Sequence, residues 1–87
     1  MHNFKKMRIV GDIPHERIKI TLFDWNGKFI AKFELDKYEQ SYKINQTDVN
    51  GLDDFKKIFD DKFIHTIMLR FLHMREDYTT ALKKVII

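Results

Sequence analysis

Four histidines are the side chains in this sequence best suited to binding a metal ion. His65 and His73 are eight residues apart in a stretch with helical periodicity. Helical metal sites commonly place two histidines four residues apart, as in H-E-x-x-H, and this sequence lacks that motif. His2 lies near the N-terminus, and His15 directly follows a proline. The spacing therefore predicts solvated histidines, with no metal and no other cofactor.

Side chains for covalent or acid–base catalysis are few. The sequence has no cysteine, and its one serine, Ser41, is not part of a G-x-S-x-G motif. The three glycines are too far apart to form a phosphate-binding loop. Asp24 and Glu34 fall on opposite faces of the hairpin predicted below, so they do not form a carboxylate pair. The sequence therefore predicts a protein that is not an enzyme.

Composition indicates one small folded domain that spans residues 1–87. The chain is 44% hydrophobic and 14% aromatic, with three glycines and one proline. These values exclude a fully disordered or a fibrous chain. The absence of cysteine also excludes a disulfide framework. The net charge of +3 is too small to establish a nucleic-acid partner by itself.

The strongest local signal is the pair Asn26-Gly27, which is typical of a type I′ turn between two antiparallel strands. With these two residues in the turn, the numbers of paired residues sum to 53. Leu22 then pairs with Ala31 on an apolar inner face, and Thr21 pairs with Lys32 on an outer face. A shift of one residue would turn every side chain to the wrong face.

A third strand is predicted from Tyr38 to Asn45, after a turn at Asp36-Lys37. A two-residue turn keeps the inner face mostly apolar, with Gln40 as a poor fit, but places Glu34 opposite Glu39. A four-residue loop preserves the faces and places Lys32 opposite Lys43 instead. Residues 7–12 could add an edge strand. The sheet is therefore an antiparallel meander of three or four strands within residues 7–45.

Two helices are predicted within residues 51–84, one short and one long. Asn50 is a candidate N-cap for the first helix, and Asp60 or Asp61 for the second. Apolar residues of the second helix recur three and four positions apart, at Ile64, Ile67, Phe71, Met74, Tyr78, Ala81 and Val85. A second row, Met68, Leu72 and Leu82, lies beside this seam. The predicted fold class is α+β, with both helices packed on one face of the sheet.

The long helix is predicted to extend beyond the sheet. At roughly 1.5 Å per residue it is about 36 Å long, whereas a strand of eight residues spans only about 26 Å. Large exposed apolar patches are rare on monomers, so a second copy of the helix is the favoured partner. The candidate dimer contact consists of Phe71, Met74, Tyr78, Ala81, Leu82 and Val85. The alternative is that the first helix or the N-terminal strand folds back over this surface.

The outer face of the sheet combines basic and aromatic residues. The candidate binding residues there are Lys19, Phe23, Trp25, Lys28, Ile30, Lys32 and Lys43. Lysines neutralise phosphates and aromatic rings stack on bases, which favours single-stranded nucleic acid as a ligand. An interface with another protein and an ordinary solvated face are the other interpretations. No RNP-type motif accompanies the pattern.

The sequence carries no signal for a membrane or for export. No run of about 18 apolar residues is present, which predicts no transmembrane helix. Arg8, Asp12 and Pro14 interrupt the N-terminal residues before an apolar signal region could form. We therefore expect a cytoplasmic protein.

Four short segments carry a resemblance to a group of known sequences. They are Ile13-Pro14-His15, Lys19-Ile20-Thr21, Trp25-Asn26-Gly27-Lys28-Phe29-Ile30 and Tyr42-Lys43-Ile44. In these segments the chain resembles short uncharacterised proteins of Bacteroidetes-type bacteria. The resemblance implies a free-standing cytoplasmic protein and transfers no catalytic or binding residue. The sequence as a whole predicts a non-enzymatic, homo-oligomeric protein-interaction module, with single-stranded nucleic-acid binding as the alternative.

Overall fold

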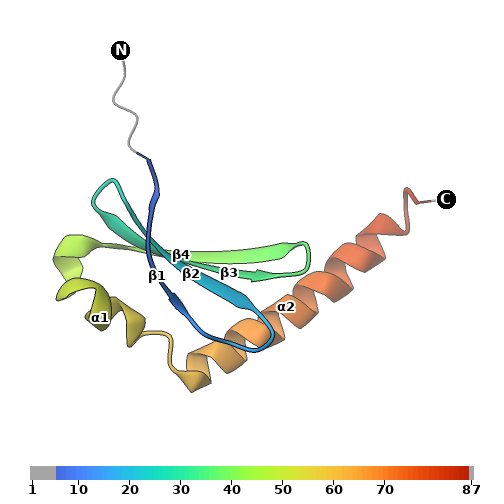
Figure 1. The fold of residues 1–87 in the computed structure, drawn as a ribbon. Helices are drawn as coiled ribbons and strands as arrows, with labels where there is room; N and C mark the ends of the chain where they lie inside the picture. The colour runs from blue at the N-terminus through green and yellow to red at the C-terminus, as the bar shows by residue number, and fades with distance from the viewer. Residues whose placement is uncertain (1–5, 87) are drawn as a thin grey trace, which may run out of the picture.

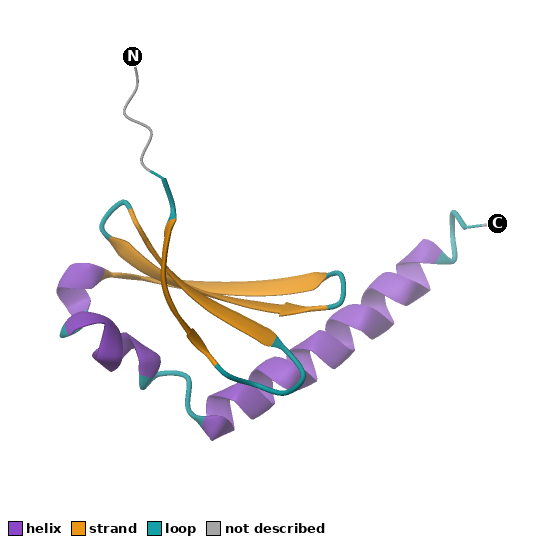
Figure 2. Cartoon of the chain, viewed as in Figure 1, coloured by secondary structure: helices purple, strands orange, loops and turns teal. Residues whose placement is uncertain are grey.

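A computed structural model describes residues 6–86 as a four-stranded sheet followed by helices (Figures 1 and 2). The strands occur in chain order along the sheet, and each pairs antiparallel with the next. They are β1 (Arg8–Ile13), β2 (Lys19–Trp25), β3 (Lys28–Leu35) and β4 (Tyr38–Asn45). A short 3-10 helix, η1 (Gln46–Asp48), leads to α1 (Gly51–Lys56) and α2 (Asp61–Leu82). The predicted α+β meander is confirmed, and residues 8–13 form the fourth strand.

The hairpin of β2 and β3 has the register predicted from its turn. Asn26 and Gly27 both have positive φ, 53° and 76°. This is the geometry that a type I′ turn requires and that asparagine and glycine adopt at little cost. Leu22 pairs with Ala31 and Thr21 with Lys32, as the turn predicts.

The hairpin of β3 and β4 uses the two-residue turn, with Leu35 paired to Tyr38. Glu34 therefore lies opposite Glu39, the like-charge contact that counted against this register. Lys32 offsets the repulsion, because its Nζ lies 3.9 Å from a carboxylate oxygen of Glu34 and 3.7 Å from one of Glu39. The register of this hairpin was ambiguous from the sequence, because cross-strand pairs were considered two residues at a time. In the structure, three charged side chains interact.

Strand β1 pairs with β2 through a β-bulge. Ile9 pairs with Phe23 and Gly11 with Leu22, so Val10 is an extra residue in the ladder. This extra residue reverses the alternation of side chains along β1. Ile13, which pairs with Ile20, therefore points toward the core. Both Val10 and Ile13 pack against the core as partly buried side chains.

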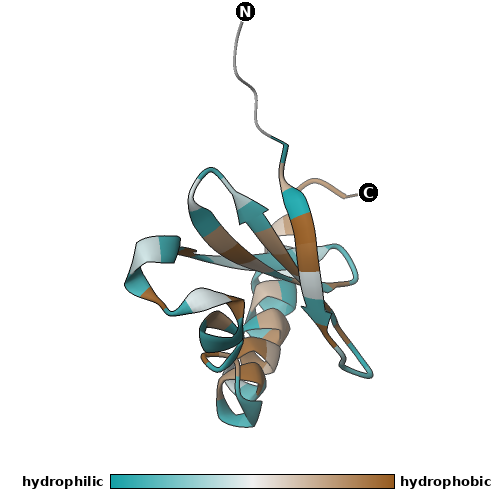
Figure 3. Ribbon diagram, turned by 60° about the vertical axis from the view of Figure 1, so that its left-hand side comes forward, coloured by the Kyte–Doolittle hydropathy of each residue, from teal (hydrophilic) through white to brown (hydrophobic). Residues whose placement is uncertain are grey.

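The core lies between one face of the sheet and the two helices. The largest fully buried side chains come from both layers: Phe33, Phe55, Phe71, Ile20, Leu22 and Ile67. Aromatic rings fill the space between the layers; the ring of Phe59 lies 5.2 Å from that of Phe33 and 5.2 Å from that of Phe55. In Figure 3, hydrophobic and hydrophilic segments alternate along the strands and along α2, as expected for elements that bury one face.

The two helices begin differently. The carboxylate of Asp60 accepts a hydrogen bond from the backbone N–H of Phe63 at 2.9 Å, so Asp60 is the N-cap of α2. Asn50 occupies the N-cap position of α1 as predicted, but its side chain makes no capping bond. Instead, its backbone N–H donates to the carboxylate of Asp54 at 3.1 Å. A carboxylate one turn into α1 thus reaches back to the start of the helix.

Candidate functional site

The apolar seam of α2 contributes to the monomer core further along the helix than the sequence indicated. Phe71 is only 2% exposed and belongs to the core, and Met74 packs against the core from the side. Tyr78 sets its ring edge-on against that of Tyr38, at the start of β4, with 6.1 Å between centroids. Phe71 is therefore unavailable as a dimer contact, which corrects the prediction at this residue.

Beyond Tyr78, α2 runs past the end of the β3–β4 hairpin (Figures 1 and 2). Val85 is 75% exposed and Ile86 is 63% exposed. The backbone N–H groups of both residues donate to the carbonyl of Leu82 at 3.0 Å, which ties the turn after α2 to the last residue of the helix. Neither α1 nor β1 folds over these side chains. The apolar residues that follow α2 are thus exposed to solvent.

A groove of about 360 Å³ lies beside α2, on the side where the sheet ends. Its apolar lining comes from both layers: Leu35, Tyr38, Met68, Leu69, Phe71 and Leu72. Three charged residues, Arg17, Asp36 and Arg75, complete the lining. We call this feature the α2 groove.

Exposed apolar side chains are concentrated around this groove and the end of α2. Eight large hydrophobic residues of the described chain are exposed, and five of them belong to α2 or the turn after it. These five are Leu69, Leu72, Tyr78, Val85 and Ile86. Scattered exposed hydrophobics are ordinary, but a concentration on one element is typical of an interaction surface.

The outer face of the sheet is less open than the sequence indicated. Ile30, predicted to be available for binding, is only 3% exposed, and Thr21 is also buried. Lys32 is engaged by two glutamates, as described above. The ammonium of Lys43 lies 6.0 Å from the centre of the Trp25 ring, at the limit of a cation–π contact. The strand register places the candidate binding residues of the outer face on neighbouring strands. Lys19, Phe23 and Lys28 are the remaining members of that group.

The three histidines that the structure describes do not assemble into a site. The Nδ1 atom of His15 accepts from the backbone N–H groups of Arg17 and Ile18, at 3.1 and 3.3 Å, and so organises the β1–β2 connection. His65 and His73 are exposed, and His2 lies outside the described residues. Between residues 6 and 86, no three or more metal-ligating side chains are grouped together.

Asp24 has a role that the sequence did not reveal. It lies on the inner face, where one carboxylate oxygen contacts the guanidinium of Arg8 at 2.8 Å. The other oxygen accepts from the side-chain amide of Gln46 at 2.9 Å. The hydrogen bonds from Arg8 and Gln46 hold the pKa of Asp24 below its ordinary value. Because Gln46 also donates to the carbonyls of Gly27 and Lys28, this cluster fastens three segments at one end of the sheet.

Comparisons of the chain with protein families, with curated proteins and with solved structures find no match. In the described part of the chain, neither helix has both the length and the apolar character required to cross a membrane. The functional argument therefore depends on the surfaces of the fold.

Proposed function

We propose that this protein is a non-enzymatic interaction module that self-associates through the C-terminal third of α2. The observation that supports the proposal is the continuation of apolar residues on α2 after its last ring contact with the sheet, at Tyr78. Leu82 is half-buried, and Val85 and Ile86 continue the apolar residues into a part of the chain where the side chains are mostly exposed. A second copy of the same helix is the simplest partner that fits an apolar helical surface.

The area that a stable dimer must bury determines which surfaces of the protein belong to the interface. Stable interfaces bury on the order of 1,200–2,000 Å² in total, more than two turns of helix can supply. The end of α2 therefore needs a neighbouring surface, and the α2 groove is adjacent to it. Each large aliphatic side chain that becomes fully buried contributes roughly 1.5–3 kcal/mol before the cost of association.

Single-stranded nucleic acid is less well supported as a ligand. Of the basic residues predicted for the outer face, Lys32 is offset by two carboxylates and Lys43 lies near the ring that would stack on a base. The remaining basic residues of this set, Lys19 and Lys28, provide a weak electrostatic footprint. We infer a cytoplasmic location as part of the same proposal, in keeping with the cysteine-free sequence.

Sedimentation of the full chain over a range of concentrations tests the proposal. We expect the weight-average mass to rise from that of the 10.6 kDa monomer toward that of a dimer. A mass that stays at the monomer value up to high micromolar concentration would exclude self-association.

A further inference from the structure

A second stripe of residues runs along α2, about a quarter turn away from the seam that faces the sheet. Its members are spaced alternately four and three apart: Met68, Leu72, Arg75, Thr79, Leu82 and Ile86. The first three of them line the α2 groove. The last two lie at the end of α2, where its apolar residues project past the sheet. This is the spacing of a helix that packs lengthwise against another helix.

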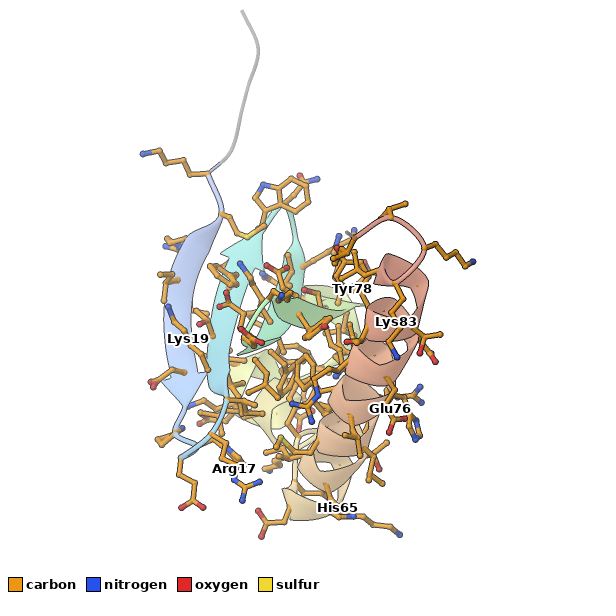
Figure 4. All side chains as sticks on the ribbon, turned by 90° about the vertical axis from the view of Figure 1, so that its right-hand side faces the viewer. Arg17, Lys19, His65, Glu76, Tyr78 and Lys83 are labelled. Atoms are coloured by element: carbon orange, nitrogen blue, oxygen red, sulfur yellow. The ribbon has the colours of Figure 1, made fainter. Side chains whose placement is uncertain are left out.

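Two opposite charges flank this stripe on the same side. Glu76 directly follows Arg75, and Lys83 directly follows Leu82. The two are seven residues apart, which returns the helix to nearly the same angular position after two turns. Figure 4 labels both side chains along α2, with Tyr78 lying toward the sheet. Neither charge has an ion-pair partner within 4.0 Å among the described residues.

We propose that two copies of this chain pair their α2 helices antiparallel about a two-fold axis near Thr79 and Thr80. This inference depends on the proposed self-association and specifies its geometry. The axis brings Glu76 of each copy beside Lys83 of the other, so the same ion pair forms twice. In that register, Ile86 of one copy lies beside Leu72 and Arg75 of the other, at the end of its α2 groove.

The opposite orientation is unfavourable for the same residues. A parallel pair of helices would place Arg75 against its own copy in the stripe. It would also leave Glu76 and Lys83 on opposite flanks of the contact from their counterparts, where they cannot pair. The antiparallel pair separates the two Arg75 side chains and forms the Glu76–Lys83 ion pair twice. Charge complementarity therefore selects the orientation, and the apolar residues supply the contact area.

A chain cannot fill its own groove with its own Ile86. Leu82 lies ten helical positions, roughly 15 Å, beyond Leu72, and Ile86 follows it in the chain after α2. Only another copy can bring Ile86 to the groove. Two-fold symmetry then fills both grooves at once and closes the assembly at two chains.

Disulfide trapping tests the orientation, and the native chain is well suited to it because it contains no cysteine. Two single variants, Arg75→Cys and Ile86→Cys, are prepared separately and oxidised alone or after mixing. A disulfide requires the two Cα atoms to approach within roughly 7 Å. We expect covalent dimers from the mixture and none from either variant alone.

The other outcomes contradict the inference in distinguishable ways. Efficient cross-linking of each variant to itself would show a parallel pair and overturn the proposed orientation. A wild-type chain that sediments as a dimer while the mixture fails to cross-link would overturn the register but leave self-association intact. A wild-type chain that sediments as a monomer would overturn both.

A charge exchange provides an independent measurement in solution. Glu76→Lys places like charges beside each Lys83, so we expect the dimer dissociation constant to rise by about tenfold. The double variant Glu76→Lys with Lys83→Glu restores opposite charges and should return the constant to nearly the wild-type value. If the double variant dissociates as readily as the single variant, these two residues do not pair.

Discussion

The side-chain amide of Gln40 donates a hydrogen bond to the backbone carbonyl of Ile67, with 2.9 Å between the two atoms. Gln40 is on the inner face of β4, and Ile67 is in the buried face of α2. The hydroxyl of Tyr42 donates in turn to the side-chain oxygen of Gln40 at 2.9 Å. A polar residue that looked misplaced in the sequence therefore joins the sheet to the long helix, with its donor and acceptor both satisfied.

This contact predicts a pH-dependent effect of Gln40→Glu. At neutral pH the carboxylate would face the carbonyl oxygen of Ile67, which we expect to lower the free energy of unfolding by roughly 2 kcal/mol. Protonation at low pH restores a donor and should recover part of the loss. Urea unfolding at neutral and acidic pH measures the difference from wild type, and Ser41→Glu on the exposed side of β4 is the control. An equal loss at both pH values would contradict the role of this bond.

The turn of the first hairpin predicts a large effect of Gly27→Val. A side chain at this position would meet no atom within 4 Å, so any loss comes from the positive φ of 76°. We expect roughly 1–3 kcal/mol of destabilisation in urea unfolding. Gly11→Ala is the matched control, because its added carbon makes an ordinary 3.7 Å contact with Leu22 and its φ needs no glycine. A larger loss for Gly11→Ala than for Gly27→Val would contradict this assignment of strain.

Asp24 predicts a loss of stability in acid. The hydrogen bonds from Arg8 and Gln46 lower the pKa of Asp24 in the folded state below its ordinary value of 3.8. The folded state therefore binds this proton less readily than the unfolded state. The stabilisation is fully present above the unfolded pKa and is lost as the pH falls through the folded pKa.

The variant Asp24→Asn isolates this contribution. We expect the free energy of unfolding of wild type to exceed that of Asp24→Asn near neutral pH and to approach it in acid. Unfolding in urea across the acidic range measures both curves. Curves that remain parallel at all pH values would show that the contacts of Asp24 do not contribute to stability.

The proposed self-association predicts that negative charges introduced at the end of α2 dissociate the dimer. Leu82→Glu combined with Val85→Glu should produce a monomer in sedimentation experiments, because unpaired charges would have to be desolvated at the contact. Helical content should remain near that of wild type, since neither residue packs against the core. His73→Glu, on the exposed side of α2 away from both the seam and the proposed contact, should leave the mass unchanged. A double variant that stays dimeric would place the contact elsewhere.

The outer face of the sheet predicts weak binding of single-stranded oligonucleotides. Fluorescence anisotropy at low salt should show no saturable binding up to high micromolar concentration. Tight binding that weakens in Trp25→Ala and loses part of its salt dependence in Lys19→Ala would instead support the nucleic-acid function.

The parts of the fold that the sequence predicted correctly are those determined by neighbouring residues. Asn26-Gly27 determines both the turn and the pairing of β2 with β3, because the turn residues and the alternation of faces agree. Asp60 caps α2 as one of two adjacent candidates. The spacing of Ile64 and Ile67 predicted which side of α2 is buried.

The parts that were missed depend on contacts between distant segments. The burial of Phe71 and the ring contact of Tyr78 depend on where β4 crosses α2, which helical spacing does not encode. Ile30 has the alternation of an outer-face residue, yet it is buried in the folded sheet. Of the residues predicted for the dimer contact, Phe71 is therefore in the monomer core, and the contact itself stays a prediction.

The bulge at Val10 also affects how the protein behaves at high concentration. Strand β1 is at one edge of the sheet, where a regular row of backbone donors and acceptors would invite another chain to add its own strand. The extra residue breaks that regular row and increases the local twist. Open-ended polymerisation through this edge is thereby discouraged, which favours discrete particles over fibrils when the protein is abundant.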